Sequence, residues 1–68
     1  MYEVLVGPLT LVVDHRESVD LLQRMQAARL RGDTEAANKL WKIVARVEAG
    51  TLDPADALKE AAPLSRAA

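Results

Sequence analysis

The stretch Arg31-Gly32-Asp33-Thr34 separates two amphipathic helical segments of this sequence. Glycine readily adopts the left-handed conformation that ends many helices, so Gly32 is expected to end the first segment. Asp33 or Thr34 is expected to cap the second, because a short polar side chain accepts a hydrogen bond from a free amide at a helix start. The sequence therefore predicts an antiparallel pair of helices. They are expected to cover residues 14–31 and 33–49.

The first predicted helix has a recognisable start and a wide apolar face. Asp14 and Glu17 have the spacing of a capping box, and Ser18 is an alternative cap. At about 100° per residue, the apolar side chains cover roughly half of the circumference, which is more than one partner helix would cover. This face consists of Val19, Leu21, Leu22, Met25, Ala28 and Leu30.

The second predicted helix has a clean apolar face opposite a charged one. The apolar face consists of Ala36, Ala37, Leu40, Ile43, Val44 and Val47. Together the two faces are expected to form the core of the fold or a dimer contact. The residues expected at its centre are Leu21, Leu22, Met25, Leu40, Val44 and Val47.

A short third helix is predicted over residues 53–62. Asp53 followed by Pro54 is a strong start signal, because proline is well tolerated at the first helical position. Pro63 is expected to end this helix, since proline lacks the amide that would continue it. Residues 63–68 are then expected to form a frayed tail.

Residues 1–13 are rich in valine and leucine and are predicted to be extended. Two arrangements remain open: a hairpin that reverses at Gly7-Pro8, or a single strand that pairs with another chain. We expect a bent strand or a wide ribbon, on the reasoning that a tight primed turn needs positive φ at both central residues. The predicted fold is thus a mostly helical, small α+β protein, a single domain over residues 1–68.

The length of 68 residues indicates that this domain is marginally stable alone. There is no cysteine for a disulfide and only one histidine, so neither crosslinks nor a metal site are expected. The remaining route to more burial is self-association. We therefore expect a homodimer in which a second chain covers the apolar sides of the long helices.

Catalysis and cofactor binding are not expected from this sequence. His15 is the only histidine and the one candidate proton shuttle, and it is expected to face solvent. Ser18 lies near it but lacks the orienting group and oxyanion site of a nucleophile, and no phosphate-binding glycine motif is present. No apolar run reaches the roughly 20 residues that span a bilayer, and Met1-Tyr2-Glu3 lacks a basic leader, so a cytoplasmic protein is predicted.

Positive charge is concentrated around the predicted helix pair. The net charge of the chain is −1, whereas residues 24–46 contain six basic and two acidic side chains. These basic residues are candidates for docking onto an acidic protein surface or phosphates. The alternative is an ordinary solvated face with pairs such as Glu35–Lys39. The candidates are Arg24, Arg31, Lys39, Lys42 and Arg46.

Trp41 and Arg29 are the two other candidate binding residues. Trp41 falls between the apolar and polar faces of its helix, where it either shields the core edge or anchors a partner. Arg29 falls on the apolar face of the first helix, where it either extends its charge into solvent or lines a contact with another chain. The sequence therefore favours a small non-enzymatic protein-binding module: an adaptor, inhibitor or assembly regulator, acting as a dimer through a helical-hairpin surface.

The order strand, helix, glycine turn, helix over residues 9–49 resembles that of ribbon-helix-helix DNA-binding proteins. The resemblance implies a dimer that lays paired strands in the major groove. Leu9, Leu11 and Val13 would then face inward, and Thr10 and Val12 would face the bases. Only Thr10 is polar, and the net charge of −1 disfavours phosphate contacts. A DNA-binding regulator is therefore the alternative function.

Overall fold

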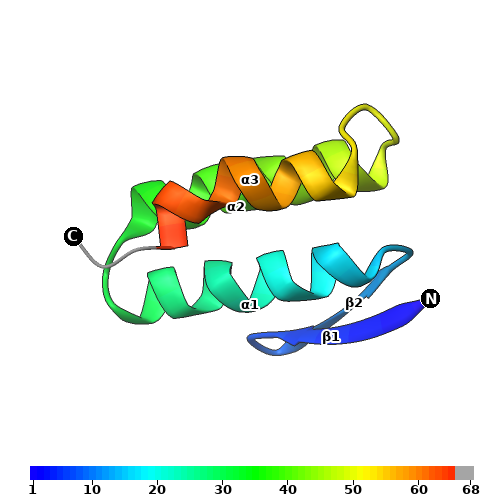
Figure 1. Cartoon of the computed structure of the whole chain (residues 1–68). Helices are drawn as coiled ribbons and strands as arrows, with labels where there is room; N and C mark the ends of the chain where they lie inside the picture. The colour runs from blue at the N-terminus through cyan, green and yellow to red at the C-terminus, as the bar shows by residue number, and fades with distance from the viewer. Residues whose placement is uncertain (66–68) are drawn as a thin grey trace.

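The computed structural model describes residues 1–65 as an antiparallel two-stranded ribbon followed by three helices (Figure 1). This confirms the predicted fold class. In Figure 1, α1 lies between the ribbon on one side and the pair α2 and α3 on the other. Residues 66–68 of the predicted tail lie outside the described residues. The elements are β1 (Tyr2–Val6), β2 (Leu9–Val13), α1 (Arg16–Leu30), α2 (Thr34–Glu48) and α3 (Pro54–Ser65).

The ribbon is a tight hairpin, not the bent strand or wide ribbon expected from the sequence. Val6 pairs directly with Leu9, so only Gly7 and Pro8 form the turn. A type II′ turn needs a positive φ at its first central residue alone. Gly7 supplies it with a φ of 60°, and the second position suits the fixed negative φ of proline. The expectation was wrong because it applied the requirement of a type I′ turn to both residues.

The reversal between α1 and α2 is built by backbone hydrogen bonds around Gly32. The amide of Gly32 donates to the carbonyl of Arg29 at 3.1 Å, and the amide of Asp33 donates to that of Ala28 at 2.8 Å. This double closure requires a left-handed residue, and Gly32 has a φ of 84°. The Asp33 side chain then accepts from the amide of Ala36 at 3.1 Å and caps α2. The predicted stop and restart are confirmed.

The start of α1 differs from the predicted capping box. The residue before the helix is His15, and its side chain makes no capping hydrogen bond. Asp14 therefore lies one position too early to cap the first turn. Ser18 is fully buried inside the helix and is not a cap either. The carboxylate of Glu48, from α2, lies at this helix start instead.

The third helix runs past the proline that was expected to end it. α3 continues through Pro63 to Ser65, because its last turn is held from outside. Leu64 packs against the core, and its carbonyl accepts a hydrogen bond from Arg31 Nη2 at 3.1 Å. The α3 residues buried against the core are Ala57 and Ala61.

The core lies between the ribbon, α1, α2 and α3. All six residues expected at its centre are buried within the single chain. The ribbon and α3 cover the wide face of α1, so the reasoning that a second chain must cover both long helices is wrong. Leu30 is an exception, because at the end of α1 it is 89% exposed. The other large apolar side chains left open are those of Met1, of the ribbon, and of Trp41, which is 46% exposed.

Replacing Gly32→Ala is expected to lower the free energy of unfolding by about 1 kcal/mol, the usual cost of left-handed backbone for a residue with a Cβ. No atom lies within 4 Å of the added Cβ, so the loss reflects backbone strain and not a clash. Gly32→Asn is the matched control and should lose less, since asparagine tolerates this conformation. Urea unfolding measures both variants; equal stability of Gly32→Ala and the parent chain would contradict the strain argument.

Candidate functional site

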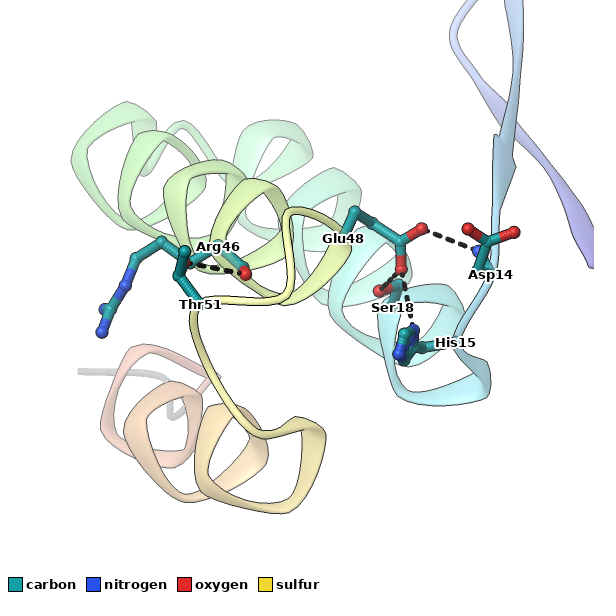
Figure 2. Close-up of polar contacts among 6 residues, drawn as sticks. All are labelled: Asp14, His15, Ser18, Arg46, Glu48 and Thr51. Atoms are coloured by element: carbon teal, nitrogen blue, oxygen red, sulfur yellow. Dashed lines mark hydrogen bonds and ion pairs between the residues drawn. The ribbon is translucent and has the colours of Figure 1, made fainter.

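The side chain of Glu48, at the end of α2, contacts Asp14, His15 and Ser18. Figure 2 shows its carboxylate directed at the junction between β2 and α1. Oε1 accepts a hydrogen bond from the amide of Asp14 at 2.7 Å, and Oε2 accepts one from the Ser18 hydroxyl at 2.7 Å. His15 Nδ1 lies 3.5 Å from the same Oε2. One carboxylate therefore joins the ribbon exit, the first turn of α1 and the last turn of α2.

The backbone beyond Glu48 is fixed by a second closure. Figure 2 also shows Thr51, whose hydroxyl donates to the carbonyl of Arg46 at 3.1 Å. The Thr51 amide donates to the same oxygen at 2.9 Å. These bonds satisfy a carbonyl that a helix end otherwise leaves free. The last turn of α2, and with it Glu48, is held in place from both sides.

The electrostatics of this cluster favour an ionised Glu48. Burial alone raises the pKa of Glu48, but the hydrogen bonds from Asp14 and Ser18 and the charge of His15 outweigh it, so the pKa is lowered. An acidic group at a helix C-terminus opposes that helix's dipole, whereas the same group near another helix's N-terminus is favourable. The negative charge of Glu48 is therefore favourable at the start of α1 and unfavourable at the end of its own helix, α2.

The cluster has the residue types of a nucleophilic triad but not its geometry. In a triad the histidine lies between the hydroxyl and the carboxylate and takes the hydroxyl proton. Here Glu48 lies between Ser18 and His15, and Ser18 donates directly to the carboxylate. The Ser18 side chain is also fully buried, so a substrate cannot reach its oxygen. His15, expected to face solvent, is instead half-buried against Glu48.

A second feature is a groove between the ribbon turn and the helix pair, with a cavity volume of about 320 Å³. Leu9 and Leu11 line it from β2, and Met25 and Arg29 line it from α1. Trp41 and Asn38 line it from α2. The structure thus brings together Trp41 and Arg29, the two residues that the sequence singled out on separate helices. We call this depression the ribbon groove.

The predicted basic residues do not form one open patch. Arg24 pairs with Asp20, Lys39 with Glu35, and Arg46 with Glu60, at N–O distances of 3.0 to 3.2 Å. Arg31 lies 3.6 Å from Asp33 and bonds to the carbonyl of Leu64. Lys42 has no ion pair among residues 1–65, and the same is true of Arg29. Most of this positive charge is therefore neutralised by neighbouring carboxylates.

The described part of the chain offers little else for chemistry. A second hollow of about 570 Å³ lies between β1, α1 and α3, lined by Tyr2, Val19 and Leu58 together with charged α1 residues, and it is widely open.

Residues 1–65 contain no group of three or more side chains arranged to hold a metal ion. Within the same range, no helix combines the length and the apolar character needed to cross a membrane. Searches of protein-family models, curated proteins and solved structures found no significant match to this chain.

Sequence reasoning missed Glu48 and Leu9 as site residues. Glu48 lies 30 residues beyond its partner Ser18, and nothing local marks such a contact. The one available signal is the negative charge of Glu48, since an acid in the last turn of a helix is unfavourable unless a partner compensates it. Leu9 was expected to face inward. Its side chain is on the inner face of the ribbon but is 62% exposed, because the groove beneath it is open.

Replacing Glu48→Ala is expected to cost about 2 kcal/mol of unfolding free energy, since two hydrogen bonds to a charged acceptor are lost and Ser18 stays buried without a partner. Glu60→Ala is the matched control: it removes a carboxylate from an exposed pair with Arg46, and should cost about 0.5 kcal/mol. Thermal and urea unfolding compare the two. Equal losses would show that Glu48 is an ordinary surface acid.

The same carboxylate predicts the pH dependence of stability. The pKa of Glu48 is lowered in the folded chain, so its contribution is complete above its unfolded pKa and is lost as the pH falls through the folded pKa. Unfolding followed from neutral to acid pH should therefore show a smaller acid loss in Glu48→Gln than in the parent chain. Parallel curves for the two proteins would contradict the assignment.

Proposed function

We propose that this chain is a small non-enzymatic protein-interaction module that binds a protein partner through the ribbon groove, as an adaptor, inhibitor or assembly regulator and in a dimeric form. The observation behind this proposal is the meeting of Trp41, Arg29 and Leu9 around one apolar depression. Tryptophan and arginine are the residues most enriched at the energetic centres of protein interfaces.

The residues that line the groove indicate the chemistry of the partner that it would bind. Met25, buried, lines the groove between the helices, and Leu9 and Trp41 present exposed apolar surface around it. Arg29 has no ion pair among residues 1–65, so a bound carboxylate finds an available cation. The fitting partner therefore offers an apolar side chain with an acidic group beside it. This combination supports protein recognition more than small-molecule catalysis.

The alternative of a DNA-binding regulator has weaker support. The outer face of the ribbon exposes Leu5 and Val12, which offer no hydrogen bonds to base edges. Phosphate contacts need available cations, whereas Arg24, Lys39 and Arg46 are paired with carboxylates. We therefore rank protein binding above nucleic-acid binding.

The test is capture of partners from the native host with Trp41→Ala and Arg29→Glu as separate baits. Each substitution is expected to reduce binding at least tenfold, since truncating a central anchor costs 2 kcal/mol or more. Lys42→Glu is the control, because it reverses an unpaired exposed charge on α2 outside the groove lining. Partners that bind all three variants as well as the parent chain would refute the groove as the binding surface.

A further inference from the structure

The outer edge of β2 is open for pairing with another strand. The described sheet contains β1 and β2 alone, and the two-residue turn makes Val6 and Leu9 a hydrogen-bonded pair. Because such pairs alternate in an antiparallel ladder, the backbone groups of Leu5 and Thr10 point away from the ribbon. Gln26 Nε2 donates to the carbonyl of Leu5 at 2.8 Å, which agrees with this assignment.

The two edges of the ribbon are therefore unequal. On the β1 edge, Gln26 of α1 occupies the outward carbonyl of Leu5. On the β2 edge, the outward groups belong to Thr10 and Val12, and no side chain among residues 1–64 bonds to them. Monomeric proteins commonly protect such an edge with charged residues. β2 has none, since its sequence is Leu-Thr-Leu-Val-Val.

We propose that a second copy of this chain pairs with this edge, β2 against β2 in antiparallel orientation, with a two-fold axis at Leu11. This inference rests on the proposed function and names the protein that fills the ribbon groove. In this register, Thr10 lies opposite Val12 of the second copy. Both residues have outward amides and carbonyls, so each such pair exchanges two hydrogen bonds. The edge is therefore complementary to itself.

The register also aligns the faces of the two ribbons. Residues directly opposite in an antiparallel pair point to the same side of the sheet. Leu11 then meets its own counterpart on the inner face, beside the groove that it lines with Trp41. The added strand covers Leu9, which is 62% exposed in the single chain. Apolar surface that the fold leaves open is thus buried by the second copy.

The area needed for a stable dimer explains why the groove must take part. A standard interface buries about 800 Å² on each partner, roughly a sixth of the 4534 Å² that this chain exposes. Two five-residue strands meeting along an edge cover only a narrow strip. Leu9, Leu11 and Trp41 provide the additional apolar surface that lies directly beside that strip.

The first experiment tests the register with two double variants on the outer face. Thr10→Lys with Val12→Lys places like charges opposite each other in both symmetric pairs, whereas Thr10→Lys with Val12→Glu places opposite charges there. Dimer dissociation constants from sedimentation velocity should differ by about tenfold or more in favour of the second variant. Within one chain, Glu3 lies opposite Val12 and favours lysine there, whereas positions 10 and 12 share one face and favour opposite charges, so urea unfolding of both variants checks that folding does not produce the result.

The second experiment tests the two-fold axis with cysteines, which the native chain lacks. Leu11→Cys should form a disulfide-linked dimer under mild oxidation, because non-hydrogen-bonded antiparallel pairs hold their Cα atoms about 4.5 Å apart. Val12→Cys is the matched control. Although it is more exposed, its counterpart lies diagonally at about 7–8 Å, so it should crosslink far less.

A parent chain that stays monomeric to millimolar concentration, charge variants with equal dissociation constants, or equal crosslinking of both cysteines would each overturn the proposal. These outcomes leave the proposed function standing if Trp41→Ala still loses a captured protein, since the groove then serves a different partner. Conversely, a dimer with the predicted charge pattern, joined to unchanged capture by Trp41→Ala, would support the second copy and refute binding of other proteins at the groove.

Discussion

The structure depends on one carboxylate that joins three segments far apart in the sequence. Glu48 bonds to the backbone at the end of the ribbon and to a side chain in the first turn of α1. β2 and α1 are joined by Asp14 and His15, and the His15 side chain makes no capping hydrogen bond. Because Glu48 belongs to α2, it also sets where the ribbon lies relative to the helix pair. Together with the packing of Val4, Val6 and Val13 in the core, this contact positions the groove between the ribbon and the helices.

Much of the fold was predictable because its signals are local. Gly32, Asp33 and the Asp53-Pro54 pair act on neighbouring backbone atoms, and each ends or begins a helix as expected. The features that were wrong depend on contacts made elsewhere. Pro63 is tolerated within α3 because Arg31 and the core hold the following residue. The contact between Glu48 of α2 and the segment that starts α1 spans 34 residues at its longest hydrogen bond, and no pattern in residues 14–18 reveals it.

The candidate site was likewise predictable only where its signals are local. Trp41 and Arg29 were recognisable individually, because each breaks the amphipathic pattern of its own helix. Their meeting in one groove was not predictable, since it depends on the placement of the ribbon turn, and that turn was expected to be wider. The pairing of the basic residues was not predictable for a related reason: spacing along a helix shows which charges share a face, but not that Glu60 of α3 lies against Arg46.

The small size of the sheet connects the fold to the proposed assembly. A two-stranded ribbon is marginal by itself, and three or more strands or a covering helix are needed for stability. Here α1 stabilises the ribbon through its inner face and, with Gln26, through the edge of β1. No side chain of residues 1–64 bonds to the edge of β2. Leu9 and Leu11, on the inner face of that strand, line the ribbon groove together with Trp41. A strand added there completes both the ladder and the apolar layer, and a chain whose edge matches its own copy provides that strand without a separate partner.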